Sequence, residues 1–196
     1  MKRKSKAERR RELLDAARDT FVEKGFQAAT IDDIVAQAAV ARGTFYLYFR
    51  DKRAVFEALV DAFLARIGRC VKSIDLSDPT PPVAQLHANI RRIVVLALEE
   101  PTIVKLALYD ATGLDPELDE KIQAFYEGLR SLIDESLEEG QALGMVRGGD
   151  RRVMVAIGLG GLKEVLVEAV SGRVEADPDQ ITAEIMLFLA GGLLSR

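Results

Sequence analysis

The sequence of 196 residues contains a single cysteine, Cys70, and a single histidine, His87. One cysteine cannot close a disulfide within the chain or build a thiolate cluster, and this usage fits a reducing compartment. His87 has no histidine or cysteine four residues away, so a histidine-based metal site is not expected. A lone histidine in a helix is more often a core or pocket-edge residue. We therefore expect no metal and no cofactor.

Long apolar runs are also missing. The longest covers residues 153–162, whereas a helix needs about 20 apolar residues to cross a bilayer. The basic N-terminus is not followed by the apolar segment of a signal peptide. There is no strand-like alternation and no internal repeat. We expect an all-α, cytoplasmic protein that does not associate with a membrane.

Catalytic motifs are scarce. The GLGG run at residues 158–161 lies inside an apolar helical pattern with no strand before it, so it lacks the context of a nucleotide fingerprint. Carboxylate pairs such as Glu99–Glu100 fall at expected helix ends, where they are most simply solvated. The sequence predicts that the protein is not an enzyme.

The chain does contain enough apolar residues, 48% of the total, to bury a sizeable core. Its charge is divided unevenly. Residues 1–53 carry 13 Lys and Arg against 8 Asp and Glu, whereas residues 54–196 carry 14 against 23. A basic head on an acidic body indicates an anionic partner for the head, although charge runs are also common on solvated helix faces. We expect domains at residues 1–53 and 54–196.

Three short helices are predicted in the head. Residues 2–11 are strongly basic and are expected to fray without a partner, whereas apolar periodicity begins at Glu12 and Gly25 marks a helix end near Lys24. Thr30 is a helix cap, with Asp33 three residues later as in a capping box. A third helix is expected from Arg42 to about Phe49. It is too short to be stable alone and must be seated on the first two.

The segment TIDDIVAQAAVARGTFYLYFRDK, residues 30–52, resembles the helix-turn-helix of the TetR family of bacterial transcriptional regulators. The resemblance lies in the Thr that opens the second helix, the Ile pair, the Val after the corner, the Gly-Thr-aromatic-Tyr run, the Tyr-Phe ending and the closing Lys. It implies that the third helix enters the major groove of double-stranded operator DNA. Arg42, Gly43 and Thr44 are then candidates for base and backbone contact.

The other DNA-binding residues implied by the resemblance are Thr30, Tyr46 and Lys52 as phosphate contacts, with Leu47 and Tyr48 beside them. Three positions depart from the family pattern. Ala39 replaces the usual Gly of the corner, so a positive φ would strain it. Ala41 replaces a Ser or Thr cap, and Leu47 replaces a polar residue, although it can pack on a thymine methyl.

Longer apolar helices are predicted in the body, the first of them from Ala54 to near Leu76, for a total of about nine helices in the chain. Similar proteins pair their last two helices with those of a second copy, which implies a homodimer. The residues expected at that interface are Met154, Ile157, Gly158, Gly161, Leu162, Val165, Ile185, Phe188 and Leu189. The family's usual pocket implies an effector site lined by Phe63, Ile67, His87, Ile90, Tyr109, Phe125, Tyr126 and Leu129.

The sequence thus predicts a homodimeric, DNA-binding transcriptional regulator. The leading hypothesis is a repressor that a small apolar or aromatic effector releases from its operator. The alternative is an effector-independent DNA-binding or architectural protein with a vestigial pocket. An enzyme is the third and least favoured class.

Overall fold

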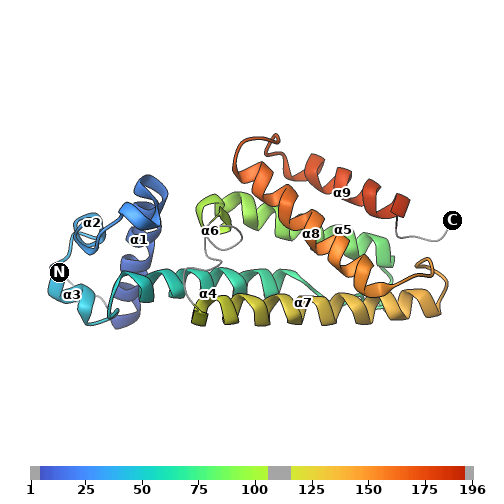
Figure 1. Ribbon diagram of the computed structural model, residues 1–196, viewed down its shortest axis with the longest axis horizontal. Coiled ribbons are helices and arrows are strands. Elements are labelled where there is room, and N and C mark those ends of the chain that lie inside the picture. The colour runs from blue at the N-terminus through green and yellow to red at the C-terminus, as the bar shows by residue number, and fades with distance from the viewer. Residues whose placement is uncertain (1–4, 106–115, 193–196) are drawn as a thin grey trace. The chain divides into compact units, whose positions relative to one another are not determined.

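The computed structural model describes residues 5–105 and 116–192, and the nine elements in these residues are all α-helices (Figure 1). The expected all-α class is confirmed. The chain forms two compact units, Met1–Ala65 and Arg66–Arg196. One helix runs continuously through the expected domain boundary at residue 53, so that boundary stays a prediction. In the described part of the chain, no helix combines the length and the apolar character that crossing a bilayer requires.

The first unit contains three helices and the beginning of a fourth. Their bounds are α1 Lys6–Ala28, α2 Ile31–Gln37, α3 Arg42–Tyr46 and α4 Lys52–Cys70. The expectation of a frayed N-terminal arm is wrong for residues 6–11, which belong to α1. The Ser5 hydroxyl accepts a hydrogen bond from the Glu8 backbone N–H at 3.1 Å, and the Glu8 carboxylate accepts one from the Ser5 N–H. This capping box fixes the helix start six residues before the apolar pattern begins.

Two expected helix signals are confirmed. Gly25 has φ 75° and interrupts α1, and Phe26 then folds back so that its ring lies edge-on to Phe21 at 5.4 Å between centroids. Thr30 caps α2 through its hydroxyl, and the Asp33 carboxylate accepts from the Thr30 N–H at 2.9 Å. These bonds satisfy N–H groups that have no partner inside the helix.

Helix α3 belongs to a part of the first unit in which the large apolar side chains are buried. The side chains of Phe21, Ile34, Phe45 and Phe49 are at most 5% exposed. Phe21 lies in α1, Ile34 in α2 and Phe45 in α3. Phe49 follows α3, and its N–H donates to the Phe45 carbonyl. Helix α3 thus packs against α2 with Phe45 fully buried, although α3 ends at Tyr46 rather than near Phe49.

The corner between α2 and α3 carries backbone strain. Ala39 has φ 51°, and no other non-glycine residue in the described ranges has a positive φ. Ala41 at the start of α3 makes no side-chain capping bond. Both departures anticipated from the sequence are thus present. An L-residue in this left-handed region costs roughly 1–2 kcal/mol.

The second unit contains the end of α4 and five further helices, α5 Pro82–Glu99, α6 Pro101–Lys105, α7 Pro116–Ala142, α8 Arg151–Val170 and α9 Pro178–Gly192. Within it, α5 packs against both α8 and α9, whereas α8 also contacts α6 and α7. Figure 1 shows α8 crossing α5 and α7 obliquely. Core residues of this unit include Ile90 and Val94 of α5, Leu137 of α7 and Leu166 of α8.

Helix α4 ends earlier than its apolar pattern predicts. The pattern continues to about Leu76, but the helix stops at Cys70. Two side chains of α5 bind the backbone at the end of α4. Arg92 donates to the Cys70 carbonyl at 2.9 Å, and Asn89 binds both the N–H and the carbonyl of Lys72, at 3.1 and 2.8 Å. These partners satisfy backbone groups that would otherwise continue the helix.

Replacing Ala39 with glycine should stabilise the first unit. The substitution removes left-handed strain of roughly 1–2 kcal/mol, and the added freedom of the unfolded chain offsets about 0.4–1 kcal/mol of this gain. We expect a net increase of up to about 1.6 kcal/mol in the free energy of unfolding, measured by urea denaturation of the whole protein. Ala36→Gly, inside α2, is the matched control and should lower stability by about 1 kcal/mol. A loss of stability in Ala39→Gly would contradict the strain.

Candidate functional site

The outer surface of α3 presents polar and cationic groups opposite its buried face. Arg42 and Gly43 are exposed, and a Cβ placed on Gly43 would meet no atom within 4 Å. Tyr46 is 48% and Leu47 74% exposed, an unusual exposure for large apolar side chains. Another macromolecule can therefore approach the backbone of α3 closely at Gly43.

The Arg42 guanidinium is held by an acid of α2. Its Nη1 lies 2.9 and 2.8 Å from the two carboxylate oxygens of Asp32, and its Nη2 lies 3.5 Å from the Tyr46 hydroxyl. The hydrogen bond with Tyr46 and the charge of Asp32 both raise the pKa of Arg42. The cation is therefore permanently charged and has a defined direction.

The neighbouring acid, Asp33, has a different role. It pairs with Lys24 of α1 at 2.7 Å and completes the capping box with Thr30. The hydrogen bonds from Lys24 and then Thr30 lower the pKa of Asp33 to about 2. Thr30, expected to contact phosphate, is here the cap of α2, with its hydroxyl 2.7 Å from Asp33.

Lys52 is used by the protein itself. Its ammonium donates to the carbonyls of Phe26, Gln27 and Ala29 at 2.6, 3.2 and 2.7 Å, and it lies 4.6 Å from the centroid of the Phe26 ring. Burial lowers the pKa of Lys52. An ammonium has three N–H donors, so this geometry favours a structural role over the phosphate contact expected from the sequence.

The remaining expected DNA-contact residues lie on or just after α3. Thr44 and Tyr48 are half-buried, whereas Leu47 is exposed. The structure therefore groups Arg42, Gly43, Tyr46 and Leu47 on the accessible side.

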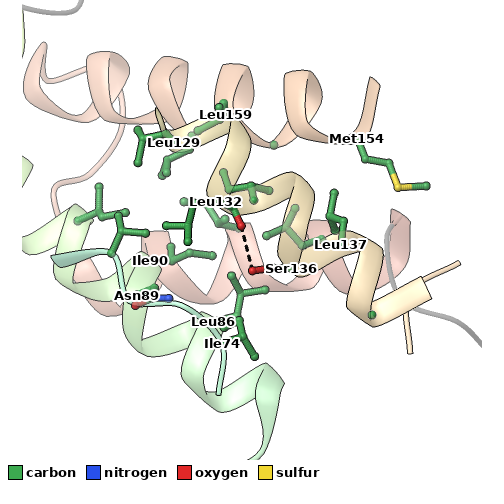
Figure 2. A pocket seen from close by; sticks show the side chains of 18 of the residues that line it. Ile74, Leu86, Asn89, Ile90, Leu129, Leu132, Ser136, Leu137, Met154 and Leu159 are labelled. Carbon is green, nitrogen blue, oxygen red and sulfur yellow. Dashed lines mark hydrogen bonds between the residues drawn. The ribbon is translucent and has the colours of Figure 1, made fainter. Parts of the chain in front are cut away.

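An apolar cavity of about 420 Å³ lies within the second unit (Figure 2). It is bordered by α4, α5, α7, α8 and α9 and by the connections between α4 and α5 and between α7 and α8. Of the residues expected around an effector, it brings together Ile67, Ile90, Phe125, Tyr126 and Leu129. Phe63 belongs to the first unit and His87 is exposed, and neither lines the cavity. Tyr109 lies outside the described residues.

The lining is mainly apolar but includes the charged residues Lys72, Glu139, Arg147 and Lys163. The side chains of Ser136 and Asn89 bind the chain itself. Ser136 donates its hydroxyl to the Leu132 carbonyl at 3.1 Å, as Figure 2 shows. Asn89 is occupied by the backbone of Lys72 and by Arg92. Tyr126 is largely buried, and burial raises its pKa. A molecule in the cavity would therefore meet mainly hydrocarbon.

Sequence reasoning missed several lining residues. Leu132 and Ile133 of α7 were recognisable, because they follow Leu129 at helical spacing. Ile74 and Leu76 could not be recognised, because the sequence pattern places them in a helix. In the structure they line the cavity from the connection between α4 and α5.

The residues expected at a dimer interface fall into three groups by exposure. Phe188 and Ile157 are 69% and 52% exposed, and Gly161 is exposed with them. Met154 is only 7% exposed and packs against Leu137 and Val155. The others, which are Gly158, Leu162, Val165, Ile185 and Leu189, are half-buried. All except Gly161 and Val165 also line the cavity.

Comparison with known proteins gives consistent matches. Residues 13–59 match the family described as bacterial regulatory proteins, tetR family. The uncharacterized HTH-type transcriptional regulator YdgC of Bacillus subtilis (strain 168) is 29% identical over 189 residues, 96% of this chain and 94% of YdgC. These proteins are named as regulators rather than as enzymes.

Two solved structures resemble the whole chain. The fatty acid degradation regulator FadR from Bacillus halodurans has a TM-score of 0.75 and 27% identity, covering 97% of this chain and 98% of that one. The transcriptional regulator FadR from Bacillus subtilis, solved in complex with stearoyl-CoA, has a TM-score of 0.73 and 23% identity, covering 93% and 98%. The second likeness is one of fold.

Replacing Lys52 with methionine tests its structural role. Methionine keeps the apolar stem but leaves three carbonyls without their donor, so we expect a loss of about 1–3 kcal/mol in the free energy of unfolding. Affinity for every DNA sequence should fall, while the slope of log K against log salt stays unchanged. A slope reduced in magnitude by about 0.9 would indicate a lost phosphate contact instead. Lys24→Met, which removes an exposed pair, is the control and should change stability little.

Proposed function

Because the chain belongs to the TetR family of bacterial transcriptional regulators, we propose that it is a homodimeric repressor released from its operator by an apolar effector. The observation that carries the proposal is the combination of two features in one chain. A seated five-residue helix exposes a fixed arginine, and a separate unit contains an apolar cavity.

The first unit supplies the DNA contact. Arg42 and Thr44 would face base edges in the major groove, with Gly43 allowing close approach. Tyr46 and Tyr48 would contact the backbone and fix the register without reading sequence, whereas Thr30 would act as the cap of α2. Leu47, as an exposed apolar residue, suits a thymine methyl.

The second copy is proposed to bind through α8 and α9. Leu187, Phe188 and Ile157 are 67%, 69% and 52% exposed, and exposed small residues lie on the same two helices. Covering such a face removes apolar area from water. Two copies would then place two α3 helices about 34–36 Å apart, the spacing of successive major grooves.

The effector is proposed to be an acyl chain or a compound of similar apolar shape. This rests on the hydrocarbon lining, on the self-satisfied polar groups of Asn89 and Ser136, and on the likeness to the fatty acid degradation regulator from Bacillus halodurans. The cavity volume of about 420 Å³ lies within the range of ligand pockets, about 300–1,000 Å³. A ligand that favours one arrangement of the body must change DNA affinity by the same coupling energy.

Placing a charge on the exposed α8–α9 face tests the dimer. Phe188→Glu should shift the protein to a monomer in sedimentation velocity. It should also weaken binding to a duplex with two half-sites by about 100-fold or more, because bivalent binding is lost. Leu143→Glu changes a residue that is 59% exposed outside this face and should do neither. A dimer that survives Phe188→Glu would argue for another interface.

Narrowing the cavity tests the effector. Stearoyl-CoA or free stearate should lower the affinity of the wild-type protein for its operator. Naphthalene is tested in the same way as an aromatic compound. Leu132→Phe should weaken this response by about tenfold, since overpacking costs about 1–3 kcal/mol, and should leave DNA affinity without ligand unchanged. Leu143→Phe, outside the cavity, is the control. If no probe shifts affinity while the operator still binds, the effector-independent alternative is favoured.

A further inference from the structure

We propose that Asp32 is a positioning residue for sequence reading, which holds one edge of the Arg42 guanidinium so that the other edge meets a guanine. The proposal rests on the proposed function, in which α3 lies in the major groove. It adds a specificity-determining role for an acid of α2.

The geometry assigns the two edges of the guanidinium. Both carboxylate oxygens of Asp32 lie within 2.9 Å of Nη1. The opposite edge, formed by Nε and Nη2, makes the long contact of 3.5 Å with the Tyr46 hydroxyl. A fork of two N–H donors is what guanine O6 and N7 require. Gripping a base therefore displaces one long hydrogen bond and leaves the pair with Asp32 intact.

Both partners are anchored. Asp32 lies in the first turn of α2, whose start is fixed by the capping box of Thr30 and Asp33. Arg42 is the first residue of α3, which is seated by the fully buried Phe45. A long arginine side chain otherwise loses rotamer freedom when it binds a base. Holding it in place beforehand removes part of that loss for the matching base only.

Stability does not account for the pair. The two side chains are 57% and 66% exposed, and exposed ion pairs contribute little to folding. Asp32 also places a negative charge on a surface proposed to face phosphates, which weakens binding to every DNA sequence. Asp32 therefore lowers the affinity for DNA of any sequence while it directs the Arg42 side chain. The result is weaker binding but stronger discrimination between bases.

The two effects of Asp32 predict opposite changes in one variant. Asp32→Ala should bind non-specific duplex more tightly and discriminate less between guanine and other bases at one position of each half-site. Arg42→Ala should lose that discrimination altogether, a change of about 5- to 150-fold for a bidentate contact. In the double variant, removing Asp32 should have no further effect on discrimination.

The experiment is selection from a random-sequence duplex library by full-length wild type, followed by affinity measurements on the selected duplex and its single-base variants. The contact of Arg42 with guanine should give a preference of roughly 5- to 150-fold over other bases. Asp32→Ala should lower this preference by about threefold to fivefold or more. Glu23→Ala, an exposed acid of α1, is the charge-matched control. It should leave the base preference unchanged. Thermal melting confirms that each variant is folded.

The outcomes are distinguishable. If Asp32→Ala binds all DNA more tightly but keeps the wild-type base preference, Asp32 only competes with DNA and the proposal is overturned. If Arg42→Ala keeps the guanine preference, another residue reads that base and the proposal is again overturned. If the wild type selects no sequence, the proposed function itself fails, and the inference falls with it.

Discussion

A helix of five residues has too few hydrogen bonds to be stable by itself, so α3 depends on the burial of Phe45. Its ring lies 5.9 Å from that of Phe49, and α3 packs against α2, in which Ile34 is fully buried. Because Arg42 is the first residue of this helix, the packing of Phe45 fixes the origin of the Arg42 side chain. The strained corner at Ala39 is tolerated since the buried Phe45 on one side and the capped α2 on the other determine its path.

The first residue of α4 is bound to the end of α1. Lys52 donates to three carbonyls of residues 26–29, where α1 has been interrupted at Gly25 and the last turn lacks continuing N–H partners. Helix α4 is continuous from this point to Cys70, which lies in the second unit. It therefore joins the first unit to the second without a break in its helical backbone. At its other end, Arg92 and Asn89 of α5 bind the terminal backbone, and α5 also borders the cavity.

The features that the sequence predicted correctly depend on residues that are close together in the chain. The cap at Thr30, the interruption at Gly25 and the strain at Ala39 each depend on a few consecutive positions, and the Ser5–Glu8 capping box was a local signal of the same kind that was overlooked. Features made by distant residues were not predictable. The end of α4 depends on Asn89, and the occupation of Lys52 depends on carbonyls more than twenty residues earlier. The Asp32–Arg42 pair joins two helices across a corner whose geometry no periodicity encodes.

In the proposed function, the cavity and the α3 surface would discriminate between ligands by different physical means. At α3, the fork of N–H donors of Arg42 would reject a base that lacks matching acceptors, and such mismatches are costly because polar groups are left unpaired. In the cavity, Ser136 and Asn89 are satisfied by the backbone and offer an effector little to bind. Selection there rests on apolar contact, in which one methylene contributes only about 0.8 kcal/mol. If the proposed function holds, the same chain would combine a narrow choice of DNA sequence with a broad choice of apolar effectors.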